Sequence, residues 1–210
     1  MIAHGPVPPV LVLRHGESTA NVQGLIVSLP GPRALTEVGL TARGRAQAQQ
    51  AAREGLARGL GPQTVVLTSD FARARETAEE FARGLGAAAP TVDVRLRERG
   101  FGAHDGGPAD AYETVWAADR ARELPGDEVE SVDEVARRVF AVLRTADERA
   151  AGAAVVLVAH GDVLQIALAL GAGRDPHEHR EVPHLGNAEL RELGPGRGSG
   201  ADGAATGGSA

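Results

Sequence analysis

Two histidines each stand before a glycine, at the end of a short apolar run. His15 follows the run at 10–13, with Arg14 between them, and His160 follows the run at 153–159. Imidazole changes its charge near neutral pH and serves as a nucleophile, a base or a ligand. Arginine pairs bidentately with phosphate and carboxylate groups. These residue types at these places predict a site that binds an anion and reacts with it.

Charged residues also follow the other apolar runs. Arg73 comes soon after the run at 63–68, and Glu98 comes soon after the alternating segment 92–96. The carboxyl ends of parallel strands lie at one edge of a sheet, where ligands bind. We therefore expect two histidines, two arginines and a carboxylate to meet there. Clustered positive charge is costly unless an anion neutralises it, so the predicted ligand is a phosphate or a carboxylate.

The elements that must position these residues alternate between strands and helices. This order predicts an α/β fold, a three-layer sandwich with helices on both faces of a mostly parallel sheet. The apolar runs predict strands at 10–14, 63–68, 92–96, 153–159 and 189–193. Capping residues and helical periodicity predict helices at 41–59, 71–85, 109–118, from Ser131 onwards, and from Asp162 to 170. The segment 19–40 is rich in glycine and proline, and we expect it to be irregular.

Composition limits the kind of protein. A length of 210 residues fits one domain, which we place at 1–193, followed by a disordered Gly/Ala/Ser-rich tail at 194–210. The net charge of −6 argues against nucleic-acid and anionic-membrane partners. The chain has no cysteine, which is typical of the cytoplasm, and no apolar run near the roughly 18 residues of a membrane span. We expect a small-molecule partner, and a homodimer stays open.

Four blocks of the sequence resemble the histidine phosphatase superfamily, the phosphoglycerate mutase-like proteins. They lie at 13–21, 69–78, 96–106 and 158–161, in the family's order and roughly at its spacing. The resemblance implies that His15 is the nucleophile that takes the phosphoryl group. It implies that Glu98 acts first as the general acid and then as the base that activates water. The residues implied to hold the phosphate are Arg14, Asn21, Arg73, His160 and Gly161, with no cofactor and no metal.

The function implied by this resemblance is hydrolysis. We expect a metal-independent phosphatase of the histidine acid phosphatase type, which acts on a small phosphorylated metabolite such as a sugar phosphate through phosphohistidine. Mutases of the family hold a phosphoglycerate carboxylate with further basic residues, including a lysine. All 22 basic residues of this chain are arginines, and the chain is short for a mutase, so the phosphatase branch is favoured. The alternatives are mutase-type phosphoryl transfer and a catalytically inactive phosphate-binding module.

The loop after the first block departs from the family pattern. The Leu-Thr…Gly start of the family's next helix occurs twice, at 35–39 and at 40–44. We favour the second because Gln47 and Ala48 follow it. The loop at 22–39 is then enlarged, and we expect it to influence which substrate is accepted. Candidate wall residues of the site are Val27, Leu29, Arg33, Phe101, His104, Tyr112, Trp116 and His184.

Three other patterns are weaker. Ser18 lies in a near match to a serine-hydrolase elbow, but no strand–helix unit precedes it to supply an oxyanion loop. His177, His179 and His184 are interpreted as part of a solvated loop rather than as a metal site. Residues 198–203 match a dinucleotide-binding fingerprint by letter, yet they follow no buried strand.

Overall fold

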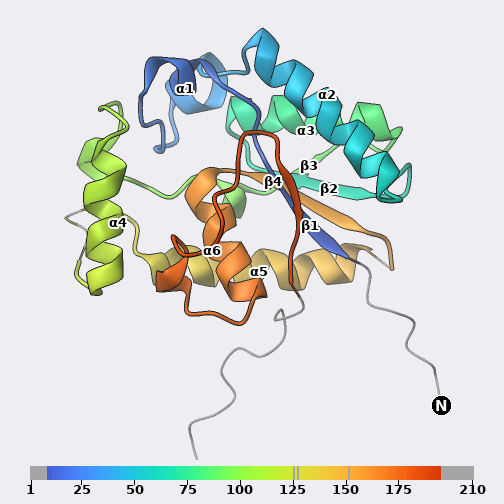
Figure 1. The fold of residues 1–210 in the computed structure, drawn as a ribbon. Coiled ribbons are helices and arrows are strands. Elements are labelled where there is room, and N and C mark those ends of the chain that lie inside the picture. Colours follow the sequence, from blue (N-terminus) through green and yellow to red (C-terminus); the bar gives the residue numbers. More distant parts are fainter. Residues whose placement is uncertain (1–8, 125, 127, 151, 195–210) are drawn as a thin grey trace, which may run out of the picture.

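The centre of the molecule is a five-stranded sheet with the order β3-β2-β4-β1-β5 (Figure 1). The computed structural model describes residues 9–124, 126, 128–150 and 152–194. The strands are β1 (Val10–Arg14), β2 (Val65–Thr68), β3 (Thr91–Val92), β4 (Val155–Ala159) and β5 (Leu190–Glu192). β5 pairs antiparallel with β1, and the other three pairings are parallel. The predicted α/β class with a mostly parallel sheet is confirmed.

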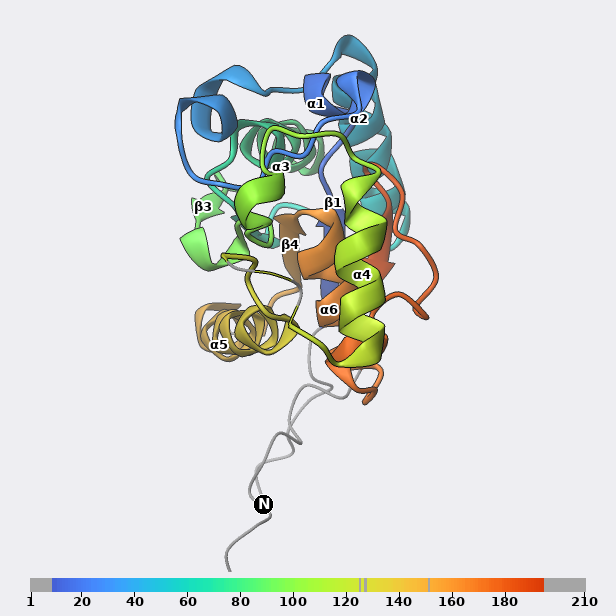
Figure 2. The ribbon, with the colours of Figure 1, turned by 90° about the vertical axis from the view of Figure 1, so that its left-hand side faces the viewer.

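Helices cover both faces of this sheet, so the three-layer prediction is confirmed as well. Figure 1 shows one pair of helices above the sheet, α2 (Ala42–Ala57) and α3 (Ala72–Leu85). The pair below it is α5 (Val132–Ala150) and α6 (Gly161–Gly171). α4 (Ala111–Ala121) lies across the carboxyl ends of the strands, in front of α6 in Figure 2. Shorter helices are α1 (Thr19–Gln23), a π-helical turn at Arg33–Glu37 and 3₁₀ turns at Val94–Leu96, Gly102–His104 and Pro176–Glu178.

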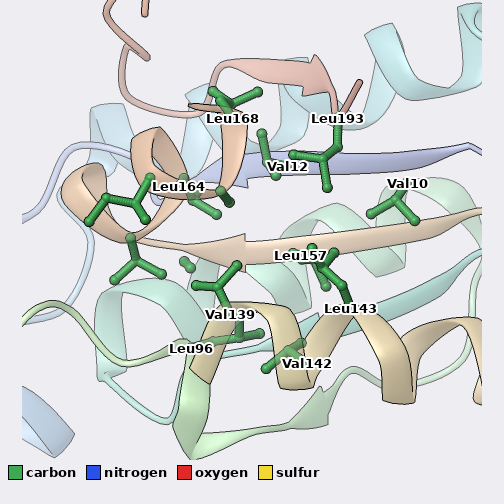
Figure 3. Close-up of a cluster of buried hydrophobic side chains, with 14 of the residues drawn as sticks. Val10, Val12, Leu96, Val139, Val142, Leu143, Leu157, Leu164, Leu168 and Leu193 are labelled. Atoms are coloured by element: carbon green, nitrogen blue, oxygen red, sulfur yellow. The ribbon is translucent and has the colours of Figure 1, made fainter. Parts of the chain in front are cut away.

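The alternation of side chains along the strands creates a core on each face of the sheet. In β4, Val155 and Leu157 belong to the core between the sheet and the helices α5 and α6. Val156 and Val158 belong to the core between the sheet and the helices α2 and α3. Figure 3 shows the first of these cores around Leu157. Burying an aliphatic side chain of this size stabilises the fold by about 1.5–3 kcal/mol. The two cores therefore hold the strands, and the residues that follow them, in fixed positions.

The predicted strand at 92–96 is wrong beyond Val92. The Asp93 side chain accepts a hydrogen bond from the Arg95 N–H at 3.0 Å and caps the 3₁₀ turn at Val94–Leu96. Only Leu96 of this turn is buried, and the Val94 side chain is 52% exposed. The apparent alternation thus combines one core residue with a capped turn, because an aspartate cap competes with strand pairing.

The segment at 19–40 contains more regular structure than predicted. Ser18 and Asn21 form a capping box that starts α1, since the side chain of each accepts a hydrogen bond from the backbone N–H of the other. The second of the two proposed helix starts is confirmed. Thr41 caps α2 by accepting a hydrogen bond from the Gly44 N–H at 3.0 Å. The first proposed start lies partly in the π-helical turn.

The start of α6 also differs from the prediction. His160 occupies the cap position, and Asp162, predicted as the cap, lies in the first turn with its side chain buried. The predicted cap of α5 is confirmed, since Ser131 and Glu134 exchange side-chain-to-backbone hydrogen bonds at 2.9 and 3.2 Å. Within the described residues, no helix is both long and apolar enough to cross a membrane. Of the predicted tail at 194–210, residues 195–210, with the 198–203 motif, lie outside the described residues. The domain limits stay a prediction.

Candidate active site

A cavity of about 230 Å³ lies at the carboxyl ends of the strands and is bordered by α4. The predicted site residues that line it are Arg14, His15, Asn21, Arg73, Glu98 and Gly161. His160 lies beside it, with its ring centroid 5.3 Å from that of His15. The structure therefore brings together residues that are up to about 150 positions apart in the chain, as the strand-end argument predicted.

His15 is held in one tautomer by two hydrogen bonds. Its Nδ1 atom lies 2.8 Å from the Gly16 carbonyl oxygen, and its Nε2 atom lies 3.2 Å from Nε of Arg73. A carbonyl oxygen only accepts and a guanidinium only donates, so the proton is assigned to Nδ1 and the lone pair to Nε2. Nε2 is therefore the atom of this ring that can attack an electrophile.

The surroundings of His15 also keep the ring uncharged. The side chain is 3% exposed. Burial, followed by the positive charges of Arg73 and Arg14, holds the pKa of His15 well below its usual value of 6.5. Burial likewise holds the pKa of His160 well below 6.5, with Arg73 and His15 as further causes. Both imidazoles are consequently neutral at physiological pH.

Three residues at the cavity carry buried polar atoms without a hydrogen-bond partner among the described residues. These atoms are Nε of Arg14, Nη1 of Arg73 and Nδ1 of His160. The other ends of the two guanidinium groups are fixed, because Arg14 Nη1 donates to the Leu185 carbonyl and Arg73 Nη2 donates to the Val27 carbonyl, both at 2.8 Å. An oxyanion in the cavity supplies the acceptors that the two guanidinium atoms lack, and it accepts from Nδ1 of His160 in the tautomer that carries the proton there.

Asn21 and the start of α6 add uncharged donors to the same place. The Oδ1 atom of Asn21 is occupied by hydrogen bonds from Ser18, while its Nδ2 group donates to no described residue. Gly161 lines the cavity at the first turn of α6, where backbone N–H groups and the helix dipole favour a bound anion. A Cβ atom at Gly161 would lie 3.7 Å from the Arg14 guanidinium.

The turn that carries His15 is pressed against two helices. A Cβ atom on Gly16 would lie 2.4 Å from the Gly44 carbonyl oxygen, and a Cβ atom on Gly44 would lie 2.1 Å from the Glu17 carbonyl oxygen. Only glycine fits at both positions, because the opposing atoms are backbone. From α3, the Thr77 hydroxyl accepts a hydrogen bond from the Gly16 N–H at 3.0 Å. The position of His15 thus depends on α2 and α3 as well as on β1.

Glu98 lies in the loop after the 3₁₀ turn and is 8% exposed. Its Oε1 atom accepts a hydrogen bond from the Arg99 N–H at 2.9 Å. Burial, and after it the negative charge of Asp162, raises the pKa of Glu98 from 4.5 to about 7, against the opposing charges of Arg73 and Arg14. A carboxyl group with this pKa can donate a proton and later accept one near neutral pH.

Sequence reasoning missed a group of buried polar residues behind the cavity. Arg99 is fully buried and pairs with Asp119 through hydrogen bonds of 2.6 and 2.8 Å. Asp162 lies 3.5 Å from the same guanidinium and accepts hydrogen bonds from Trp116 Nε1 at 3.0 Å. The signal available in the sequence was the position of Asp162 two residues after His160, which we interpreted as a cap.

The far wall of the cavity was predicted only in part. Of the candidate wall residues, Val27, Tyr112, Trp116 and His184 line the cavity, whereas Leu29, Arg33, Phe101 and His104 do not. Tyr112 and Trp116 stack with nearly parallel rings at 5.3 Å between centroids. The Arg180 guanidinium lies 3.6 Å from the centre of the Trp116 ring. Arg180 and its partner Gln165 were missed because no local pattern links them to the strand ends.

The weaker sequence patterns find no support as sites. Among the described residues, no group of three or more His, Asp or Glu side chains is arranged to hold a metal. His177 faces Asp133 at 3.4 Å, His179 lies 3.9 Å from Asp119, and His184 lies 3.2 Å from Arg14. The Ser18 hydroxyl donates to Asn21 Oδ1 at 3.0 Å and caps α1, as expected of a structural serine.

The α/β fold, with paired histidines and arginines at its strand ends, agrees with what comparison with known families shows. The chain belongs to the histidine phosphatase superfamily, branch 1, whose family model matches residues 10–201. This agrees with the resemblance seen in the sequence blocks.

Individual relatives include both mutase-named and phosphatase-named proteins. A probable phosphoglycerate mutase, GpmB of Yersinia enterocolitica, is 31% identical over 190 residues, which are 88% of this chain and 83% of that protein. A mycobacterial glucosyl-3-phosphoglycerate phosphatase, solved in complex with VO3, has a TM-score of 0.69 and 26% identity over 87% of this chain and 90% of its own. YhfR of Bacillus stearothermophilus shares the fold with a TM-score of 0.73, at 24% identity over 87% and 89% of the two chains.

Proposed function

We propose that the protein is a phosphomonoesterase that hydrolyses a small phosphorylated metabolite through a phosphohistidine on His15. The observation that carries this proposal is a set of buried atoms on Arg14, Arg73 and His160 that have no hydrogen-bond partner among the described residues. They surround a neutral histidine whose Nε2 lone pair accepts a hydrogen bond from Arg73. Unpaired cations beside a nucleophile suit a substrate that brings negative charge to the reacting atom.

The first step forms a phosphorus–nitrogen bond. Nε2 of His15 attacks the phosphorus atom, and the bond from phosphorus to the leaving oxygen breaks. The arginines and His160 hold the phosphoryl oxygens, which bear the charge of the transition state. Glu98 supplies the proton that the leaving oxygen needs, so that an alcohol departs. Nδ1 of His15 keeps its proton and donates a hydrogen bond to the Gly16 carbonyl oxygen. This hydrogen bond stabilises the ring as it becomes positively charged.

The second step returns the enzyme to its starting state. Glu98, now ionised, takes a proton from a water molecule as that water attacks the phosphorus atom. The phosphorus–nitrogen bond breaks, and inorganic phosphate leaves. Because the pKa of Glu98 is about 7, the same group serves as the acid and then as the base with little energetic penalty at neutral pH. No step requires a metal ion.

The cavity supports a small and partly polar substrate such as a sugar phosphate. Its volume of about 230 Å³ falls below the range of roughly 300–1,000 Å³ that is usual for drug-sized ligands. Beyond the phosphate end, the wall combines the rings of Tyr112 and Trp116 with the polar groups of Gln165, Arg180 and His184. The relative that is a glucosyl-3-phosphoglycerate phosphatase is consistent with a phosphorylated sugar derivative as the substrate.

A panel of phosphomonoesters tests this proposal. Purified protein is incubated with sugar phosphates, phosphoglycerates, phosphoserine and 4-nitrophenyl phosphate, and inorganic phosphate is measured with and without a chelator. We expect phosphate release that a chelator leaves unchanged and that His15→Ala abolishes. A wild-type protein that releases no phosphate and forms no labelled intermediate would instead support a phosphate-binding module without catalysis.

Mutase-type transfer is the second candidate, and the 31% identity with a probable phosphoglycerate mutase favours it. A mutase must keep phosphohistidine from reacting with water until the phosphoryl group returns to the substrate. The assay is therefore repeated with 3-phosphoglycerate, and both 2-phosphoglycerate and free phosphate are followed. Isomerisation that is faster than hydrolysis would replace our proposal with this one.

A further inference from the structure

A second carboxylate, Asp162, lines the same cavity as Glu98 and has no part in the two steps above. It lies in the first turn of α6 and is 3% exposed. Trp116 Nε1 donates to both of its oxygens at 3.0 Å, and Arg99 Nη1 lies 3.5 Å from Oδ2. These contacts hold the buried carboxyl group at a fixed place.

The charges around Asp162 do not cancel. Arg99 is its cationic neighbour, but the same guanidinium makes two shorter hydrogen bonds to Asp119. His179 lies 3.9 Å from Asp119, and burial lowers its pKa, so it is neutral. In the buried cluster of Arg99, Asp119 and Asp162, one guanidinium is therefore shared between two carboxyl groups.

Glu98 faces charged groups from several elements. Two arginines favour the ionised form of the Glu98 carboxyl group, Arg14 at the end of β1 and Arg73 in α3. Tyr112 from α4 is a neutral phenol, because burial and the nearby carboxylates raise its pKa further. Asp162 from α6 opposes the arginines. On the outer side of Glu98 a separate groove holds Arg97, Glu130 and Arg138, in which Arg97 is paired with Asp70 and Arg138 with Glu130.

We propose that Asp162 is a positioning residue of the active site, whose negative charge keeps the Glu98 carboxyl group protonated until the leaving oxygen takes the proton. Arg99 joins the two carboxyl groups, since its backbone N–H holds Glu98 at 2.9 Å and its guanidinium holds Asp162. The catalytic meaning of this inference rests on the proposed function. The effect of Asp162 on Glu98 exists in the resting protein, without any turnover.

Substrate binding strengthens this effect. In the empty cavity, Arg14 and Arg73 oppose Asp162 at Glu98. A bound phosphate group neutralises the two arginines, so that the repulsion between Asp162 and Glu98 is no longer offset. After the proton has left, the same repulsion makes Glu98 a stronger base toward water. One fixed charge thus assists both proton transfers.

The test is the Asp162→Asn variant, which keeps the shape and an acceptor for Trp116 but removes the charge. Glu98 must be protonated to act as the acid, so kcat/KM for an alkyl phosphate falls as the pH rises through its pKa. We expect the variant to move this alkaline limb down by about 1 pH unit. Activity above the limb then falls about tenfold, while activity on its acidic side is retained. With 4-nitrophenyl phosphate, whose leaving group needs little protonation, the loss is smaller.

Trp116→Phe is the matched control, because it removes the hydrogen bond to Asp162 and keeps the charge. We expect the alkaline limb of this variant to stay in place, whatever happens to KM. An Asp162→Asn protein that folds and turns over with an unshifted limb overturns the inference. A uniform loss at every pH overturns it too, since it marks Asp162 as a structural residue or as the proton donor itself.

A titration of the Glu98 carboxyl group by ¹³C NMR separates this inference from the proposed function. The Glu98→Gln protein identifies the resonance, and no substrate is needed. We expect a lower midpoint in Asp162→Asn than in the wild type, and an equal midpoint refutes the inference even if phosphate is released. Should Asp162→Asn fail to fold, Asp119→Asn removes one charge from the same cluster and is expected to shift the midpoint in the same direction.

Discussion

At the scale of single residues, the site depends on which groups are charged. Burial and two arginines keep His15 neutral, and the Gly16 carbonyl decides which of its nitrogens carries the lone pair. Burial and Asp162 keep Glu98 protonated up to about pH 7. The proposed nucleophile and the proposed acid are therefore both in their reactive forms over the same range of pH.

The pH dependence of kcat/KM follows from these two groups. The pKa of His15 lies well below 6.5, so this residue causes no loss of activity between pH 7 and its own lowered pKa. Glu98 causes a decline above about pH 7, because its proton is then lost. Glu98→Gln should remove this decline and lower activity toward alkyl phosphates by a factor on the order of 10²–10⁴. A steep loss of kcat/KM centred on pH 6.5 and caused by His15 would contradict the account. The control for protonation of the leaving group is 4-nitrophenyl phosphate, whose leaving group needs little protonation.

At the scale of the elements, the strand ends and helix starts decide where these residues lie. Apolar runs and caps predicted β1, β2, β4 and the starts of α2 and α5, because local burial and capping determine them. The same patterns failed at Val94, where the neighbouring Asp93 caps a turn, and at Asp162, whose side chain accepts a hydrogen bond from the distant Trp116. The roles of Arg99 and Arg180 were not predicted, because their partners, Asp119 and Gln165, lie far away in the sequence.

The contact between the His15 turn and α2 gives a prediction at this scale. Gly44→Ala places a Cβ atom 2.1 Å from the Glu17 carbonyl oxygen, so the backbone must shift. We expect a loss of roughly 1–3 kcal/mol in the free energy of unfolding and a fall in kcat on the order of 100-fold, since the nucleophile moves with the turn. Chemical denaturation and steady-state kinetics measure the two effects.

Gly61→Ala is the control for this substitution, because no heavy atom lies within 4 Å of a Cβ atom at Gly61. Its free energy of unfolding should change by no more than about 0.5 kcal/mol, with kcat unaltered. Equal kinetics in the two variants would show that the close contact at Gly44 does not position His15.

At the scale of the whole molecule, ligand binding and folding are coupled. Only folding brings together the atoms of Arg14, Arg73 and His160 that have no partner among the described residues. An anion that binds this group of atoms therefore stabilises the folded state. The predicted ligand class, a phosphate or a carboxylate, came from the sequence because the strand ends converge. The size and the far wall of the cavity could not be predicted from the sequence, because they depend on α4 and on the loop that carries Arg180.

Thermal unfolding with inorganic phosphate tests this coupling. Phosphate at 100 times its Kd adds about 2.7 kcal/mol to the stability, which corresponds to roughly 5–10 °C in Tm for a chain of this size. Arg73→Ala should lose most of this shift relative to its own baseline. Arg75→Met, a substitution of a partly exposed arginine in the same helix, should retain it. Equal shifts in both variants would show that phosphate binds elsewhere.

The central claim of the account is that His15 carries the phosphoryl group. The most direct measurement is the mass of the protein after rapid mixing with an active substrate and quenching in base, which preserves phosphohistidine. Glu98→Gln is included with 4-nitrophenyl phosphate, whose leaving group needs little protonation. The intermediate then still forms, and the loss of the base slows attack by water and lets it accumulate. We predict one acid-labile phosphoryl group per chain, located on His15 by peptide mapping and absent from His15→Ala. Full turnover by His15→Ala, or a phosphoryl group on another residue, would contradict the account.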